Sequence, residues 1–76
     1  MPIIAYLLMV AEVGREYDIA SQVRGIEGIT EARIVYGEFD IVARLEVPDL
    51  SVLDGIVTRM RGIPGIIKTS TLIASP

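Results

Sequence analysis

The sequence contains one short motif twice. Residues 23–29 read VRGIEGI, and 37 positions later residues 60–66 read MRGIPGI. Each copy follows a stretch with apolar residues at helical spacing and precedes a stretch that can form a strand. In a chain of 76 residues, this repeat predicts a single domain, residues 1–76, that uses the unit strand, helix, strand twice.

Four segments have the hydrophobic pattern of strands. Residues 3–11 are apolar at odd and even positions alike, which is typical of a central strand buried on both faces. Residues 29–36 and 39–47 alternate between apolar and polar side chains, as strands with one buried face do. Residues 66–74 contain a run of polar side chains and are therefore predicted to form an edge strand.

The two remaining apolar patterns predict helices. The first helix follows Gly14, and we expect Gly25 to adopt the left-handed conformation that ends many helices. The second follows Asp49, a residue type that caps helix N-termini, and ends at Gly62.

The second and third predicted strands form a hairpin. Only Gly37 and Glu38 separate them, and glycine in the first position of a two-residue loop favours a type II′ turn. That turn fixes a register in which apolar residues face apolar residues and a carboxylate faces a guanidinium. The expected pairs are Tyr36 with Phe39, Ile34 with Ile41, Ala32 with Ala43, and Glu31 with Arg44.

With right-handed crossovers, this order of elements predicts an α+β, ferredoxin-like βαββαβ fold. Its four-stranded antiparallel sheet has the order 4-1-3-2, with two helices on one face. The other face would carry either the odd or the even residues of segment 3–11, and both sets are apolar. Hydrophobic residues make up 51% of the chain, more than a small core can hide, so we expect a dimer by sheet-on-sheet packing.

Composition argues against several function classes. Cysteine and histidine are absent and the ten carboxylates are scattered, so we expect no metal site, no cofactor and no catalytic residue. A net charge of −3 argues against direct binding of nucleic acid. The first apolar run is too short to span a membrane, and the first basic residue, Arg15, follows it, unlike in a signal peptide. We therefore expect a cytoplasmic protein.

Three segments, taken together, resemble a known family. They are residues 25–29, the Gly-x-x-Asp turn at 37–40, and residues 63–66 leading into 69–74. In this order they resemble the effector-binding RAM module of the Lrp/AsnC transcriptional regulators. The resemblance implies dimers that assemble further into an octamer or ring, with a small effector, commonly an amino acid, in clefts between dimers. Typical members begin with a helix-turn-helix domain. For this chain the resemblance therefore implies a stand-alone module without a DNA-binding domain, and this module would modulate full-length regulators.

The resemblance also implies where the effector binds. The family's pocket draws on the Gly-x-x-Asp turn, on the residue three positions before its glycine, and on the last strand. The candidate residues are Ile34, Gly37, Glu38, Asp40, Ser70, Thr71, Leu72, Ile73 and Ala74. Asp40 would accept the ammonium group of an amino acid, while backbone N–H groups near Gly37 and the hydroxyl of Ser70 or Thr71 would hold its carboxylate.

Simpler interpretations of these residues stay open. Gly37 can serve the turn alone, Asp40 can be solvated or ion-paired diagonally with Arg33, and residues 69–71 can simply keep an edge strand soluble. Two other functions fit the same order of elements. An ACT-type amino acid sensor would bind its ligand near residues 11–14, and a dimeric α+β barrel enzyme, such as a small monooxygenase, would share the fold.

Overall fold

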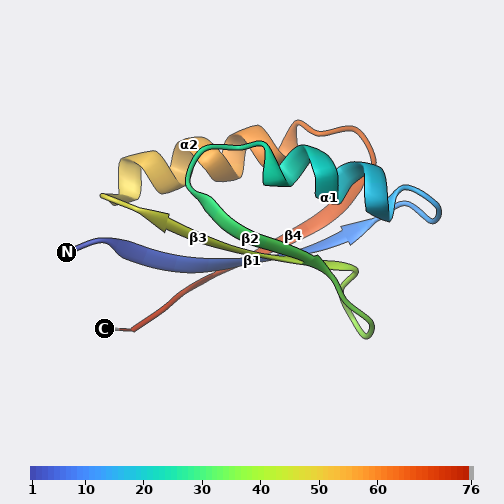
Figure 1. The fold of residues 1–76 in the computed structure, drawn as a ribbon, viewed down its shortest axis with the longest axis horizontal. Coiled ribbons are helices and arrows are strands. Elements are labelled where there is room, and N and C mark those ends of the chain that lie inside the picture. The colour runs from blue at the N-terminus through green and yellow to red at the C-terminus, as the bar shows by residue number, and fades with distance from the viewer. Residues whose placement is uncertain (76) are drawn as a thin grey trace.

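The computed structural model describes residues 1–75 and has the predicted order of elements. The elements are β1 (Ile3–Ala11), α1 (Glu16–Arg24), β2 (Ile29–Ile34), β3 (Ile41–Val47), α2 (Leu50–Arg61) and β4 (Ile66–Ile73). The strands are antiparallel in the order β2-β3-β1-β4, and both helices cover one face of the sheet (Figure 1). The predicted ferredoxin-like α+β fold is therefore confirmed. No helix within residues 1–75 has the length and apolarity needed to cross a membrane.

The core lies between the sheet and the two helices. Alternate residues of β1 and β3 point toward the helices and are almost completely buried, which is the period-2 pattern of a strand with one core face. Each helix contributes one stripe of three buried residues. The largest fully buried side chains are Leu7, Met9, Ile19, Ile41, Leu45, Met60 and Val23. The core therefore draws on both halves of the repeated sequence.

The two copies of the repeated motif have the same backbone conformation. After α1, the N–H of Ile26 donates to Val23 O over 3.1 Å, and after α2, the N–H of Ile63 donates to Met60 O over 3.0 Å. Gly28 and Gly65 then adopt φ values of +101° and +99°. A left-handed Gly25 was predicted, and this is wrong, because Gly25 has φ −79° and extends the helical turn. The left-handed residue comes three positions later, where the chain turns back toward the sheet.

The register between β2 and β3 is confirmed at three of the four predicted pairs, and the fourth, Tyr36 with Phe39, is not formed. Ile34 lies opposite Ile41, Ala32 opposite Ala43, and Glu31 opposite Arg44. The side chain of Asp49 accepts a hydrogen bond from the N–H of Val52 over 2.9 Å, so the predicted cap of α2 is also confirmed.

The predicted two-residue hairpin turn is wrong. Strand β2 ends at Ile34 and β3 begins at Ile41, so residues 35–40 form a loop. The N–H of Val35 still donates to Asp40 O over 2.9 Å, but no backbone hydrogen bond within the described chain closes Tyr36 onto Phe39. The bond between Val35 and Asp40 still follows the predicted register, so the chain departs from it only at residues 36–39, where Gly37 has φ +133° instead of the value of about +60° that a type II′ turn needs.

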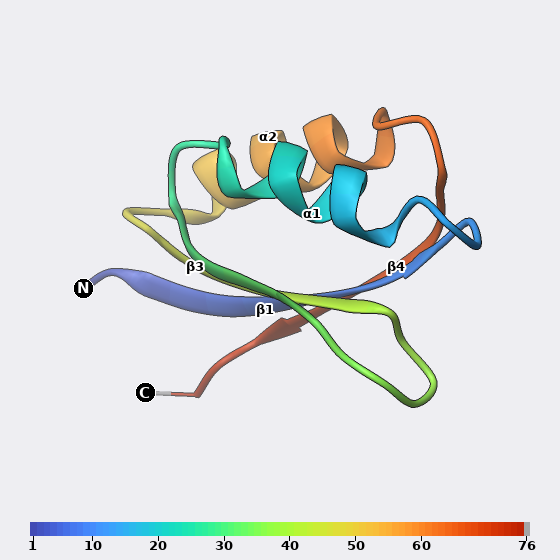
Figure 2. The same cartoon turned by 45° about the vertical axis from the view of Figure 1, so that its right-hand side comes forward.

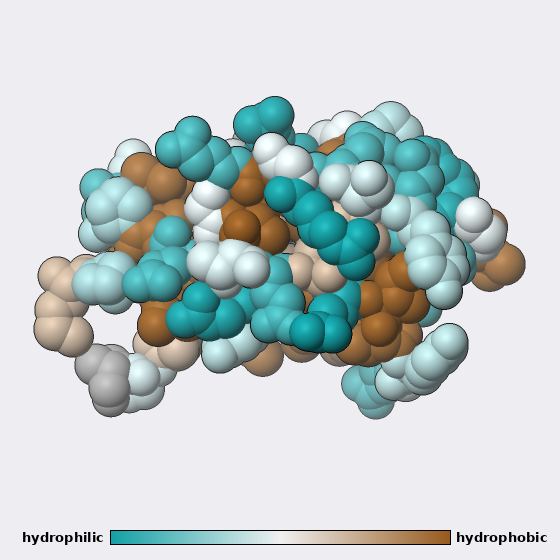
Figure 3. Space-filling model, in the orientation of Figure 1, coloured by the Kyte–Doolittle hydropathy of each residue, from teal (hydrophilic) through white to brown (hydrophobic). Residues whose placement is uncertain are grey.

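The sheet face opposite the helices carries no covering element (Figure 2). In β1, Tyr6 is 39% exposed, and its neighbours on this face, Ile4, Leu8 and Val10, are half-buried. Leu72 of β4 lies beside Tyr6 and is 51% exposed. Viewed from the side, the molecule shows hydrophobic side chains reaching its surface between polar ones (Figure 3). This helix-free face is therefore apolar along β1 and at Leu72 of β4.

The conformation of Gly65 generates a stability prediction. A Cβ at this position would combine a positive φ with contacts of 2.9 Å to Ile19 Cδ1 and Arg15 Nη1, and Ile19 is fully buried. We expect Gly65→Ala to lower the free energy of unfolding, measured with urea, by about 1–3 kcal/mol.

Two other glycines provide matched controls. Gly14 has φ +86° but open space around it, so Gly14→Ala carries the strain without the contacts and should cost less. Gly55 lies inside α2 with open space around it, so Gly55→Ala should stabilise by about 0.5–1 kcal/mol. Equal effects of the three substitutions would contradict this explanation.

Candidate functional site

Asp40 connects the loop at 35–40 to the end of the central strand. Its Oδ2 accepts a hydrogen bond from the N–H of Ala11 over 2.9 Å, and its own N–H donates to Met9 O over 2.8 Å. The N–H of Ala11 is available because the pairing between β1 and β3 ends at Met9 and Ile41, so no residue of β3 lies opposite Ala11. Asp40 is half-buried, and its other carboxylate oxygen, Oδ1, has no partner among the described residues. One oxygen is therefore used by the fold and the other can bind a ligand.

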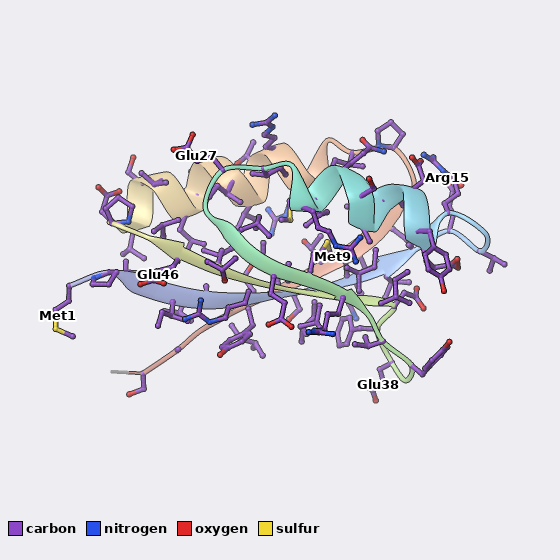
Figure 4. The ribbon with its side chains drawn as sticks, viewed as in Figure 1. Met1, Met9, Arg15, Glu27, Glu38 and Glu46 are labelled. Carbon is purple, nitrogen blue, oxygen red and sulfur yellow. The ribbon has the colours of Figure 1, made fainter. Side chains whose placement is uncertain are left out.

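The tip of the same loop is exposed. Gly37 has φ +133° with open space where a side chain would lie, and Glu38 is exposed. Figure 4 shows Glu38 at the far end of the loop, on the side of the sheet away from the helices. Ile34, by contrast, is half-buried and packs against the core. The loop thus presents a backbone turn and two carboxylates beside the end of β1.

The candidate residues of β4 divide between the two sheet faces. Ser70 pairs with Leu8 and Leu72 pairs with Tyr6, so both lie on the helix-free face. Thr71 pairs with the buried Leu7 and therefore lies on the helix side. Only one of the two hydroxyls can therefore face any single site on one side of the sheet.

The helix-side residues of β4 line two different pockets. Thr71 lines a pocket of about 340 Å³ against α2, together with Leu50, Leu53, Asp54, Val57 and Arg61. Ile73 and Ala74 line an apolar pocket of about 440 Å³ against the N-terminal residues 1–4. The candidate residues of β4 thus do not converge on one cavity.

Within one chain, Asp40 and the last candidate residues, Leu72 to Ala74, lie toward different ends of β1. Asp40 is bonded next to Met9 and Ala11, at the C-terminal end of β1, whereas Ile73 pairs with Ala5, near its N-terminal end. A site that uses both groups would need residues from two copies of the chain.

Charged side chains occupy the β2 and β3 side of the helix-free face. Glu31 pairs with Arg33, and Arg44 lies 3.7 Å from Glu46 and donates to the hydroxyl of Thr30 over 2.8 Å. The hydrogen bond and charge of Arg33 lower the pKa of Glu31, and Glu31 in turn raises the pKa of Arg33. Asp40 does not take part in these ion pairs. The alternative interpretation, a diagonal ion pair between Asp40 and Arg33, is therefore not what the structure shows.

Sequence reasoning missed two features of this region. The partner of Asp40 is a backbone N–H, and the pattern of side chains carries no signal for it. The arginines that end the two helices also donate through Nε, Arg24 to Ala32 O and Arg61 to the hydroxyl of Thr69, and the sequence analysis assigned them no contact. The sequence signal for these two hydrogen bonds is that the arginines occupy equivalent positions in the two copies of the motif. No cluster of metal-ligating side chains is present within residues 1–75.

The bond between Asp40 and Ala11 generates a second prediction. Asp40→Ala leaves the buried N–H of Ala11 without an acceptor, which should lower the free energy of unfolding by about 1–3 kcal/mol. Asp40→Asn keeps an acceptor oxygen and should cost less than about 1 kcal/mol. Glu38→Ala, at the exposed tip, should change the stability by no more than about 0.5 kcal/mol. If Asp40→Ala and Glu38→Ala unfold at the same urea concentration, Asp40 does not hold the loop.

The ion pair of Glu31 generates a pH prediction. Because its pKa is lowered in the folded state, the pair stabilises the fold above the ordinary value of 4.5, and this stabilisation is lost as the pH falls through the lowered pKa. We expect the titration midpoint of Glu31, followed by NMR, to lie below 4.5 and to rise toward that value in Arg33→Gln. Unchanged midpoints in the variant would show that Arg33 is not the cause.

Comparisons with known proteins place this arrangement in a family. The family model described as the Lrp/AsnC ligand binding domain matches residues 6–75. The crystal structure of FFRP-DM1 is 35% identical with a TM-score of 0.91, and the match covers 96% of this chain and 99% of that one. The hypothetical protein PHS023 from Pyrococcus horikoshii is also 35% identical with a TM-score of 0.91, covering 97% of this chain and 90% of that one.

A more distant relative shares the fold alone. The transcriptional regulator NMB0573 from Neisseria meningitidis, solved as a complex with L-Met, is 14% identical with a TM-score of 0.86; the match covers 97% of this chain and 50% of that one. A comparison with curated proteins gives no match. Because the family model covers nearly all of the sequence, this chain belongs to the Lrp/AsnC ligand-binding domain family and is an effector-binding regulatory domain.

Proposed function

We propose that this domain binds a free amino acid and that binding changes how copies of the chain assemble. The observation that carries the proposal is the carboxylate of Asp40, which is fixed by one oxygen on Ala11 beside an exposed glycine turn. A preorganised carboxylate suits an ammonium group, and N–H groups in a glycine turn suit a carboxylate. The complex of the Neisseria regulator with L-Met supports an amino acid as the class of effector.

Sheet-on-sheet packing of two copies is the second part of the proposal. The helix-free face exposes Tyr6 and Leu72 and carries an apolar row along β1, and a second copy can cover these residues. The charged side of this face holds two acidic and two basic residues. Its net charge is therefore zero, and it can pack against the same surface of a second copy without repulsion between net charges. These residues are Glu31, Arg33, Arg44 and Glu46.

The effector site would then form between copies. Asp40 and the later residues of β4 lie apart in one chain, so one copy would supply the loop at 35–40 and another would supply residues 70–74. Ser70 and Leu72 lie on the helix-free face, whereas Thr71 lies on the helix side. A ligand bound at such a junction stabilises the assembly by mass action. The readout of binding is therefore the oligomeric state.

We further infer that the domain regulates by binding rather than by catalysis and that it acts on full-length regulators of its family. The Lrp/AsnC family is regulatory, which supports this role. In that role the helix-free face and the loop at 35–40 would be shared between this chain and a regulator.

A ligand screen tests the proposed function. Each of the common L-amino acids is added at millimolar concentration, and the thermal unfolding midpoint and native mass are measured. We expect at least one amino acid to raise the midpoint and shift the mass, because a ligand at 100 times its Kd contributes about 2.7 kcal/mol. Asp40→Asn, which retains the bond to Ala11 but not the charge, should lose this response. If no amino acid changes either quantity, the ligand part of the proposal is wrong.

Two variants separate assembly from ligand binding. Leu8→Glu places a charge within the apolar row of the helix-free face and should reduce the native mass to that of one chain. Val13→Glu is the matched control, because Val13 is 97% exposed in the loop before α1 and should leave the mass unchanged. Equal native masses for the two variants would show that copies do not associate through this face.

A further inference from the structure

The internal repeat builds two pockets in equivalent positions. The pocket beside β2 has a volume of about 420 Å³ and is lined by Arg24 and residues 29–33. The pocket beside β4 has a volume of about 220 Å³ and is lined by Arg61 and residues 66–69. A shift of 37 positions along the sequence maps one lining onto the other. The two helix-to-strand connections that frame them arch at opposite ends of the helical layer (Figures 1 and 2).

The pocket beside β2 satisfies its own charges. Arg24 lies at the end of α1, and its Nε donates to the backbone oxygen of Ala32 over 3.0 Å. Arg33 is paired with Glu31, so the pocket's second cation has an acid within the same lining. Arg24 also occupies a carbonyl of the edge strand β2, which blocks that carbonyl from pairing with another strand.

The pocket beside β4 has the same backbone but different chemistry. Lys68 stands where the first copy has Glu31, and Ser70 stands where it has Arg33. Arg61 donates through Nε to the hydroxyl of Thr69 over 3.2 Å, which orients the guanidinium without neutralising it. Within residues 1–75, neither Arg61 nor Lys68 takes part in an ion pair. The lining therefore holds two basic residues and no acid, with Arg61 on the helix side of the edge strand and Lys68, which pairs with Val10, leaving it toward the helix-free face.

The sequence around this pocket also has more basic than acidic residues. After Asp54 the chain has no acidic residue, although it holds three of its seven basic residues there, Arg59, Arg61 and Lys68. The chain as a whole carries a net charge of −3, so the end of α2 and the strand β4 form a local positive region on an acidic protein. An anion that approaches the molecule is attracted to this region.

We propose that the pocket beside β4 binds a small carboxylate that bears a short apolar group. The Nη nitrogens of Arg61, with Nε held by Thr69, can donate to both oxygens of a carboxylate, and Lys68 adds positive charge from the other side of the edge strand. Ile66 and Ile67, the latter 66% exposed, line the same pocket and can contact the apolar group. This site is separate from Asp40 and does not depend on the function proposed above.

The carboxylate can come from either of two sources. One is a free carboxylic acid in solution. The other is the side chain of Glu38 of a second copy, which is exposed at the tip of the loop at 35–40 (Figure 4). Both sources offer the same chemistry to Arg61 and Lys68.

A titration with isobutyrate at constant ionic strength tests the site. The δ1 methyl groups of isoleucine are followed by NMR, because Ile66 and Ile67 line this pocket and Ile29 lines the equivalent pocket beside β2. We expect the methyl signals of Ile66 and Ile67 to shift and saturate while that of Ile29 stays in place. Isobutyramide, which has a similar shape and no charge, should shift none of them.

Three variants locate the binding groups. Lys68→Glu installs the residue of the first copy and should raise the Kd for isobutyrate at least tenfold, as should Arg61→Gln. Arg59→Gln removes a cation from the same helix that does not line the pocket and should change the Kd less than twofold. The proposal is overturned if Ile66 and Ile67 do not respond to isobutyrate, or if Lys68→Glu binds it as tightly as the parent.

The source of the carboxylate is then decided by the native mass. If isobutyrate lowers the native mass of the parent and Glu38→Gln has the lower mass without it, the site is occupied by Glu38 of a second copy. If isobutyrate saturates the methyl signals and the mass is constant, the site takes a free acid. Both results support a carboxylate site beside β4.

Discussion

The central strand β1 is apolar on both faces, and the rest of the molecule depends on this constraint. Its odd-numbered residues are buried under the helices, so its even-numbered residues must lie on the face that no helix covers. Because β1 pairs with β3 on one side and β4 on the other, this apolar row runs through the middle of the sheet. Within residues 1–75 no element covers this row, and this is why we propose that a second copy of the chain removes it from water.

The sequence predicts the fold well where local pattern and tertiary packing agree. The strand order, the pairing of Glu31 with Arg44 and the cap at Asp49 all follow from alternation or residue type, and all are confirmed. Both wrong predictions concern places where the chain reverses. The hairpin opens between Val35 and Asp40, because Gly37 does not adopt the conformation of a type II′ turn. The left-handed glycine lies at position 28, because the chain turns toward the sheet one turn later.

The candidate site was less predictable than the fold. The resemblance named residues from the loop and from β4, and the structure separates them along the length of β1. Spacing within a sequence cannot show such a separation, because it depends on which strand ends lie together. The anchoring of Asp40 is equally hidden, since its partner is the backbone of Ala11, just beyond the last pair of β1 and β3. A site that relies on backbone donors cannot be recognised from the pattern of side chains in the sequence.

The repeat shows how one backbone can support two kinds of chemistry. Gly28 and Gly65 have nearly equal φ values, and an arginine ends the helix before each of them, so the geometry of the two halves is the same. The side chains around these arginines differ, because Glu31 gives an internal ion pair in one half and Lys68 leaves positive charge in the other. Two like charges close together repel and do not stabilise the fold, whereas a bound carboxylate would neutralise them. This difference between the halves is the basis of the carboxylate site that we propose beside β4.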